Sequence, residues 1–359
     1  MSDIGTTPAL YAALPTIQID GQDEDDLSAN LIALLVEETT AGLYRCEATF
    51  RNFGTRSSGA DYLYFDRQLL DFGKPFAVRA GAGEAEATIF SGRIMALEAQ
   101  FLTMTPPELV VLAEDRFQDL RMTRRSRSFE NVSDSDVVSA IAGQYNLQTD
   151  IDIDGPTYPV LTQLNQSDLA FLRERARAVD AEAWLEAETL HVQARSRREA
   201  DSVTLTYREG LIEFQVLADL AHQRSSVTVG GWDVAAKTAI AAESTASAIQ
   251  PELNGYRSGA AILADAIGPR HERIVHQAPF SNDEAQHLAQ AYYRTAARRF
   301  VTGQGVCAGN GRLRVGTRIT LRGLGPLFNG DYTVTSVRHT FDDNGFQTRF
   351  AVERPGIGA

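Results

Sequence analysis

Cysteine is scarce in this sequence. Among 359 residues only Cys46 and Cys307 occur, and they lie far apart in the chain. A structural disulfide is therefore not required, and assembly in a reducing cytoplasm is compatible with this count. Cys46 shares one side of an alternating segment with Ala48 and Phe50, which predicts a buried thiol.

Long hydrophobic runs are also missing. The longest, residues 31–36, is far shorter than the roughly 20 residues that a membrane helix needs. Residues 1–6 lack the basic segment followed by an apolar one that marks a secretory signal. These absences predict a protein that does not insert into a membrane.

Positive charge is in deficit. The chain has 34 Lys and Arg against 47 Asp and Glu, a formal net charge of -13. A duplex-binding protein usually presents a basic face, so we expect no specific nucleic-acid binding. The basic clusters at residues 121–127 and 195–198 are interpreted as solvated or salt-bridged surface.

No segment carries a complete catalytic, nucleotide-binding or metal-binding signature. His271 and His276 flank Glu272, but they are five residues apart, whereas a zinc protease needs two histidines four apart on one helical face. Ordinary histidines are the favoured interpretation. The glycine-rich segment 303–309 opens into a strand pattern rather than a helix, and residues 54–59 lack the lysine of a phosphate loop. We expect no catalytic residue, no cofactor and no metal ligand.

The first third of the chain has the alternating pattern of β-strands. The acidic run 23–26, which lacks the glycine and distant glutamate of a calcium loop, is interpreted as a solvated turn. Short strands joined by turn clusters suggest a closed or nearly closed antiparallel barrel. The predicted strands are residues 17–19, 44–50, 76–79, 87–99 and 108–113.

The pattern changes to a helical period after Asp115. Ser133 and Ser167 are predicted to cap two helices, and residues 183–192 to form a hairpin. A strand pattern resumes over residues 203–229. Residues 241–259 carry no strong period and are predicted to be a loop. Ser281 and Glu284 then form the capping box of a third helix. The apolar stripe predicted for it is Ala285, Leu288, Ala289, Tyr292, Ala296 and Phe300.

The last fifty residues predict a closing sheet. Residues 312–322 alternate, with four apolar side chains on one face and four arginines on the other. Residues 332–341 and 346–353 form a hairpin around 342–345. The apolar face consists of Leu313, Val315, Ile319 and Leu321.

Three stretches carry a resemblance to a known family: residues 330–339 within the closing sheet, residues 112–129, and residues 164–175. In their order and spacing, the chain resembles the baseplate hub proteins of contractile phage tails and injection systems, the late-control D family. It is also similar to the hub part of the type VI secretion VgrG spike proteins. The resemblance covers nearly the whole chain, and its motifs are packing patterns rather than catalytic signatures.

The resemblance implies an α+β, mainly β fold with two antiparallel β-barrel domains and an inserted α+β domain. The first barrel is expected over residues 1–113 and the insert over 114–202. The second barrel is expected from 203–234 plus 301–359. The loop and helix segment 235–300 is expected to pack with the insert.

The implied function is a structural baseplate hub rather than an enzyme. Two similar barrels in each subunit of a homotrimer place six barrels in a ring, which adapts a sixfold inner tube to a threefold spike. The expected partners are inner tube or tube initiator proteins, a separate spike protein and other baseplate components. Such a protein is assembled in the cytoplasm and joins a phage tail or an extracellular injection particle. The alternative is a peptidoglycan hydrolase of a tail tip.

The arginine face of residues 312–322 leaves two interpretations open: a channel lining or acidic-partner surface, and a plain solvent-facing edge. The last six residues, 354–359, cannot build the small barrel and β-prism that follow the hub in the spike proteins. A separate spike is therefore expected at the carboxy-terminal sheet, and deleting 354–359 is expected to weaken its attachment more than trimerisation. The partner-binding candidates are Arg312, Arg314, Arg318, Arg322 and Arg354.

Overall fold

The computed structural model describes residues 14–56, 59–198, 200–234 and 236–358. With 50% of its residues in strands and 21% in helices, the protein has the mainly β composition that the sequence predicts. The prediction that no secretory signal opens the chain concerns residues outside the described ranges.

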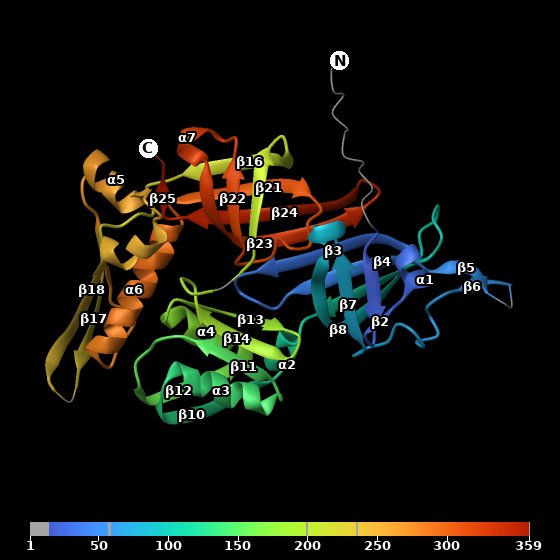
Figure 1. Cartoon of the computed structure of the whole chain (residues 1–359). Coiled ribbons are helices and arrows are strands. Elements are labelled where there is room, and N and C mark those ends of the chain that lie inside the picture. Colours follow the sequence, from blue (N-terminus) through green and yellow to red (C-terminus); the bar gives the residue numbers. More distant parts are fainter. Residues whose placement is uncertain (1–13, 57–58, 199, 235, 359) are drawn as a thin grey trace, which may run out of the picture.

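One sheet of thirteen strands runs across the molecule (Figure 1). Its amino-terminal part pairs the strands in the order β2-β1-β7-β8-β9-β4-β3, and β3 then pairs with β23. Strands β1, β4, β7, β8 and β9 match the predicted ones closely, whereas β2 and β3 were not predicted. Their bounds are β1 (Thr16–Ile19), β2 (Gln22–Asp23), β3 (Leu31–Thr39), β4 (Arg45–Arg51), β7 (Pro75–Ala80), β8 (Ala87–Gln100) and β9 (Glu108–Glu114).

The carboxy-terminal part of this sheet closes into a six-stranded β-barrel. The order is β23-β22-β15-β16-β21-β24, and a ladder between β23 and β24 completes the ring. The strands come from two segments of the chain, and the predicted hairpin around 342–345 is confirmed. Their bounds are β15 (Ser202–Tyr207), β16 (Gly210–Ala218), β21 (Val301–Ala308), β22 (Arg318–Arg322), β23 (Gly330–Asp342) and β24 (Gly345–Arg354).

The strand predicted over residues 312–322 is shorter than expected. Only its second part is a strand, β22, whereas residues 311–317 turn across the barrel end. The backbone at Gly316 has φ +90°, which a strand does not allow, and its N–H donates to the Val334 carbonyl. The predicted apolar face is nevertheless confirmed, because Leu313, Val315, Ile319 and Leu321 are all buried.

An α+β unit is inserted between β9 and β15, and it has its own apolar core. Ser133 and Ser167 cap its two main helices by accepting hydrogen bonds from Asp136 N and Ala170 N, as predicted. The bounds are α2 (Phe117–Arg121), β10 (Arg124–Val132), α3 (Asp134–Gln144), β11 (Gln148–Asp152), β12 (Tyr158–Ser167), α4 (Asp168–Ala178), β13 (Ala181–Glu186) and β14 (Thr189–Ala194).

Three strands between residues 226 and 274 form a separate sheet that the sequence does not predict. Strand β17 (Ser226–Asp233), expected in the second barrel, pairs instead with β18 (Thr238–Thr245) and β20 (His271–Ile274). The predicted loop 241–259 is wrong for its first part, which belongs to β18. The alternation in β18 is between small residues, with Ile240 and Ala242 inward, so its hydrophobic contrast is low.

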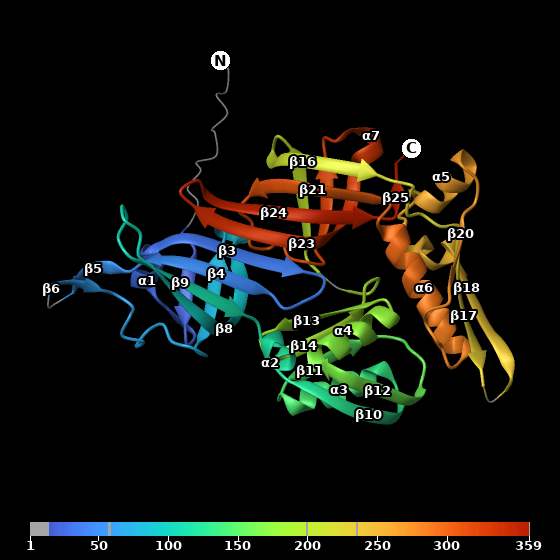
Figure 2. The same cartoon turned by 180° about the vertical axis from the view of Figure 1, so that it is seen from behind.

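Helix α6 (Asn282–Arg298) covers one face of this sheet, as Figure 2 shows from behind. Ser281 caps it by accepting a hydrogen bond from Glu284 N. The buried stripe is rotated from the predicted one at its carboxy-terminal end: Tyr293 and Ala297 enter the core, whereas Tyr292 is only partly buried.

Short elements complete the chain. The hairpin of β5 and β6 projects from the amino-terminal sheet, at the far side of the molecule from β17 and β18 (Figure 1). The bounds are α1 (Asp25–Ala29), β5 (Phe53–Arg56), β6 (Gly59–Tyr62), η1 (Gly83–Ala85), η2 (Ala246–Ala248), η3 (Gln250–Glu252), β19 (Arg257–Ser258), α5 (Gly259–Ala266), α7 (Gly325–Phe328) and β25 (Gly356–Ile357).

Candidate functional site

Two of the predicted partner-binding arginines are engaged within the chain. Arg312 is exposed, and its Nε lies 3.1 Å from Asp201 Oδ2. Arg314 forms an ion pair with the buried carboxylate of Glu38 and donates to the Thr88 carbonyl at 2.8 Å. Burial raises the pKa of Glu38 above its ordinary value, although the charge of Arg314 opposes this. Arg314 is therefore a structural residue that ties the 311–317 turn to β3.

Arg318 and Arg322 are the predicted residues that remain available. Both are exposed on β22, and neither side chain forms an ion pair or hydrogen bond with another described residue. The two open interpretations of this arginine face, a partner surface and a solvent-facing edge, therefore now concern Arg318 and Arg322.

Arg354 does not lie on a partner surface, which corrects the prediction made for it. Its guanidinium is buried and donates to the carbonyls of Asn329 and Leu327 at 3.0 and 2.9 Å. It also stacks between the rings of Tyr256 and Tyr332. Burial, which outweighs the opposing effect of the two tyrosines, lowers its pKa from the ordinary value. Arg354 anchors the end of the chain.

The segment after Arg354 is also internal. Gly356 and Ile357 form β25, which pairs with β19 and is buried. Deleting residues 354–359 would therefore remove part of the folded chain, so the deletion cannot report selectively on spike attachment.

Replacing Arg354 with methionine should lower the free energy of unfolding by about 2 kcal/mol, because two carbonyl acceptors lose a charged donor. Methionine retains an apolar side chain beside the two tyrosines. Arg322→Met, at an exposed position, should change it by less than about 0.5 kcal/mol. Urea unfolding of both variants checks this, and equal losses would contradict the anchoring role of Arg354.

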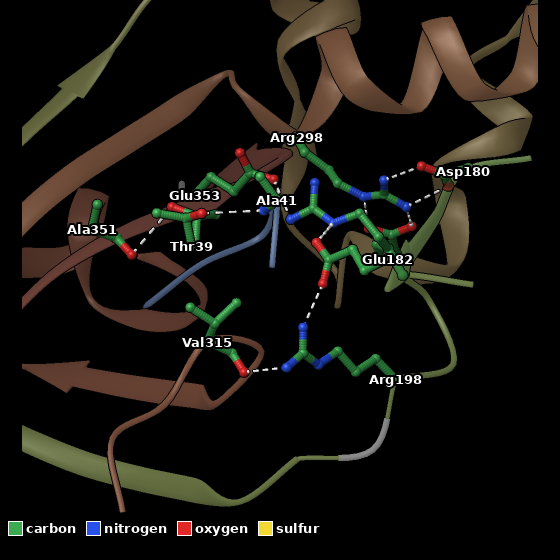
Figure 3. A network of polar contacts seen from close by, with 12 residues as sticks. Thr39, Ala41, Asp180, Glu182, Arg198, Arg298, Val315, Ala351 and Glu353 are labelled. Carbon is green, nitrogen blue, oxygen red and sulfur yellow. Dashed lines mark hydrogen bonds and ion pairs between the residues drawn. The ribbon is translucent and has the colours of Figure 1, made fainter. Parts of the chain in front are cut away.

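A buried network of charges joins three parts of the chain, and the sequence does not predict it. At its centre, Arg298 at the end of α6 donates two hydrogen bonds to the carboxylate of Asp180, at 2.5 and 2.8 Å. It donates two more to Glu252 in η3, both at 2.7 Å. Figure 3 shows the Arg298 side chain directed at Asp180. Burial alone lowers the pKa of Arg298, but the two carboxylates reverse this and hold it above the ordinary value.

The second half of the network connects the insert to the barrel. Arg195 lies between Glu182 on β13 and Glu353 on β24, with N–O distances of 2.7 and 2.8 Å. Arg198 contacts the other Glu182 oxygen at 2.7 Å and donates to the Val315 carbonyl at 2.6 Å (Figure 3). These contacts fix strand β13 against the 311–317 turn and the last barrel strand.

The network is balanced in charge and closely packed. Four carboxylates meet four guanidinium groups, which is the condition under which buried charges are tolerated. The guanidinium of Arg198 lies 3.9 Å from the ring centre of Trp184. A side chain at Gly316 would collide with Arg198, so this position requires glycine. The eight residues are Asp180, Glu182, Glu252, Glu353, Arg195, Arg198, Arg294 and Arg298.

The residues that resemble catalytic groups have structural partners. Nδ1 of His271 is 2.8 Å from Ser226 Oγ, and Nε2 of His276 is 3.4 Å from Tyr292 OH. Within the described residues, no group of three or more histidines, cysteines and carboxylates is placed to hold a metal ion. No described helix is long and apolar enough to cross a bilayer.

Three buried titratable groups also have structural rather than chemical roles. Asp115 has a pKa raised to about 7 by burial, yet its carboxylate accepts the backbone N–H groups of Tyr44 and Phe117. Both cysteines are buried and free, which confirms the prediction for Cys46. Burial raises the pKa of both thiols, that of Cys307 to about 12. Neither thiol is poised to react.

Comparison with known proteins gives a family and a fold. The sequence model of a family described as the Alg8 N-terminal domain matches residues 17–343. No curated protein matches the chain. The 43 kDa tail protein of prophage MuSo2 from Shewanella oneidensis has a similar structure, with a TM-score of 0.69 and 12% identity. That match covers 95% of this chain and 98% of the tail protein.

Two further structures share the fold. The tail protein from Neisseria meningitidis MC58 has a TM-score of 0.65 at 12% identity, covering 97% of this chain and 98% of its own. The Escherichia coli c3393 protein, a component of the type VI secretion system, has a TM-score of 0.57 at 12% identity. Here the coverage is 94% of this chain and 76% of the c3393 protein. The fold is thus that of phage tail and type VI secretion proteins.

Proposed function

The chain belongs to the Alg8 N-terminal domain family, and from that premise we propose that it is the structural baseplate hub of a contractile tail or injection particle. In this role, three copies form a ring that adapts a sixfold inner tube to a threefold spike. The hub works by binding its partners over large surfaces in a symmetric ring, and it catalyses no reaction. It is assembled in the cytoplasm and becomes part of a phage tail or an extracellular injection particle.

The observation that carries the proposal is the continuous thirteen-stranded sheet. Its closed part contains six strands, and its open part, apart from the two-residue β2, contains another six. Each copy thus offers two six-stranded units joined edge to edge through β3 and β23. Three copies bring six such units into a ring, which supplies six sites to a tube and three identical faces to a spike.

The buried network supports this role because a symmetry adaptor must hold its parts in fixed positions. Arg195 and Arg198 join the insert to the barrel, and Arg298 joins α6 to the insert. Buried ion pairs of this kind are directional, and separating them leaves uncompensated charges. The network therefore resists rotation of the insert against the ring.

The surface of the barrel also suits binding more than catalysis. A hollow of about 720 Å³ lies on the outside of β16, β21, β23 and β24, beside β3. Its outward side chains carry both signs, among them Glu37, Glu213, Arg338 and Arg349. A broad, shallow, mixed-charge surface is typical of wet protein interfaces. We propose that tube proteins and a separate spike protein bind the two faces of the ring.

Native mass spectrometry and electron microscopy of the purified protein test the proposal. We expect a homotrimer with a central opening, and binding of a spike protein to one face. A protein that stays monomeric or dimeric at micromolar concentration would contradict the hub role. Release of soluble fragments from purified peptidoglycan by the wild type would instead support the hydrolase alternative.

A further inference from the structure

The projecting β5–β6 hairpin exposes a cluster of aromatic rings. Tyr62 is its centre and stacks on Phe65 with ring centres 4.8 Å apart. Phe53 and Phe101 pack edge-on against Tyr62 at 5.9 and 6.3 Å. Phe101 is 63% exposed, and the three others are between 37% and 41% exposed. We call these four residues the aromatic hairpin. A contiguous exposed apolar patch of this kind marks an interaction site.

A second unpartnered surface lies on the three-stranded sheet. Helix α6 covers the face that carries Ile240 and Ala242, and the opposite face carries Gly230, Ala239 and Ala241. We call this opposite face the small-residue face. Trp232, 58% exposed, lies beside Ala239 in the same ladder. Between the Trp232 ring and the Arg273 side chain that covers Gly230, this face carries only the methyl groups of Ala239 and Ala241, and bulky rings can pack there.

The acidic side chains beside the aromatic hairpin are complementary in charge to the cations beside Gly230 and Ala239, whereas Glu243 lies at the far end of the small-residue face. Asp61, next to Tyr62, and Glu98, shortly before Phe101, form no ion pair with any described residue. On the small-residue face, the Arg273 guanidinium lies over Gly230, and Lys237 follows at the hairpin tip. Neither cation is paired with a described carboxylate. Opposite charges around an apolar contact favour the correct partner and orientation.

One copy cannot bring these two surfaces together. The aromatic hairpin and the small-residue face lie at opposite sides of the molecule in both views (Figures 1 and 2). Two different complementary patches at opposite ends define a head-to-tail contact, which generates a closed ring when the rotation between copies is suitable. The occupant that fits each patch by size and charge is therefore a second copy of this chain.

We propose that the aromatic hairpin of one copy docks on the small-residue face of the next. This inference rests on the proposed ring and deepens it by naming a contact between neighbouring subunits. Aromatic rings that lose their water when they dock supply much of the binding energy of an interface through a few side chains. Tyr62 and Phe101 are therefore the expected hot spots of the contact.

Cysteine pairing across the contact tests the proposal. Differently tagged chains carrying Ala60→Cys, an exposed position two residues before Tyr62, and Ala239→Cys are co-expressed and treated with a short bismaleimide cross-linker. The native Cys46 and Cys307 are 2% and 1% exposed, so they do not compete. The matched control pairs Ala60→Cys with Asp343→Cys, an exposed position at the β23–β24 turn. We expect a cross-linked heterodimer for the first pair and none for the control.

A second variant measures the strength of the contact. Phe101→Lys removes the ring and adds a charge of the same sign as Arg273, so it should weaken ring formation at least tenfold, and its thermal unfolding should match the wild type because Phe101 is largely exposed. A wild-type trimer with no 60–239 cross-link, and with Phe101→Lys still trimeric, would overturn this contact and leave the ring intact. A wild type that is monomeric under all conditions would overturn both the contact and the hub proposal.

Discussion

Replacing Arg298 with methionine should lower the free energy of unfolding by about 3–5 kcal/mol, the range for breaking one side of a buried ion pair. Arg298 is 4% exposed, and it is the main cation of both Asp180 and Glu252. Methionine fills much of the volume but leaves Glu252 without a charged donor and Asp180 with the longer contact to Arg294, at 3.5 Å. Asp180 is itself only 5% exposed, so water cannot replace the lost hydrogen bonds without opening the junction.

Chemical denaturation followed by circular dichroism measures this effect. The matched control is Arg349→Met, because Arg349 is exposed on β24 and forms no ion pair within the described residues. Arg298→Lys should give an intermediate loss, since lysine keeps the charge but cannot form the forked contact. Adding Asp180→Asn to Arg298→Met should recover part of the loss. If Arg298→Met and Arg349→Met behave alike, the junction does not stabilise the chain.

The central role of Arg298 could not be read from the sequence. Arg298 and Asp180 are 118 residues apart, and Asp180 lies in the turn between α4 and β13. The basic cluster 195–198, interpreted as solvated or salt-bridged, supplies two cations of the network. A single sequence shows that charges are present, but their partners depend on the tertiary fold. The sequence did contain one signal. Arg298 lies seven residues after Ala291, which places a charged residue on the buried side of α6.

Local features such as helix caps were predictable because contacts between residues close in the sequence determine them. The caps at Ser133 and Ser167 need only the next turn of chain, and both are confirmed. The alternation from Leu313 to Leu321 correctly gave the buried face, although the strand is shorter. Its first part is diverted by Gly316 and by the Arg314–Glu38 pair, and the second of these is a long-range contact.

Strand pairing was less predictable than strand existence. The barrel depends on a parallel ladder between β15 and β22, and the thirteen-stranded sheet depends on the pairing of β3 with β23, which lie far apart in the chain. Hydrophobic alternation cannot specify such partners, because any strand with a buried face satisfies it. The small-residue strand β18 was not predicted for a related reason: its inward residues Ile240, Ala242 and Ser244 alternate with outward alanines, so the two faces differ little in hydrophobicity.

The barrel should lose stability on acidification because of His339. This side chain is fully buried on β23, with Nδ1 3.0 Å from Thr348 Oγ1, and its ring stacks on Phe346. Burial, and then the nearby positive charge of Arg314, lower its pKa from 6.5 to about 3. A protonated imidazolium is therefore poorly tolerated at this position.

The direction of the effect follows from proton binding. The unfolded chain takes up a proton at His339 near pH 6.5, whereas the folded chain stays neutral until about pH 3. Between these values the unfolded state holds more protons, so the free energy of unfolding decreases as the pH falls. The stabilisation is fully present above pH 6.5. At about 1.4 kcal/mol per pH unit, the decrease between pH 6.5 and about 4.5 is about 2–3 kcal/mol.

Replacing His339 with phenylalanine should remove this pH dependence. The ring stack on Phe346 is retained, while Thr348 loses one hydrogen-bond partner, a loss of about 1 kcal/mol at every pH. Urea unfolding at about pH 7 and about pH 4.5 should therefore show a smaller difference for His339→Phe than for the wild type, by about 2–3 kcal/mol. Asp115, whose raised pKa acts in the opposite direction, is common to both proteins and cancels in the comparison. The exposed His222, changed to phenylalanine, serves as the control and should keep the wild-type difference. If His339→Phe also keeps that difference, the imidazole at this barrel position does not control the acid sensitivity of the fold.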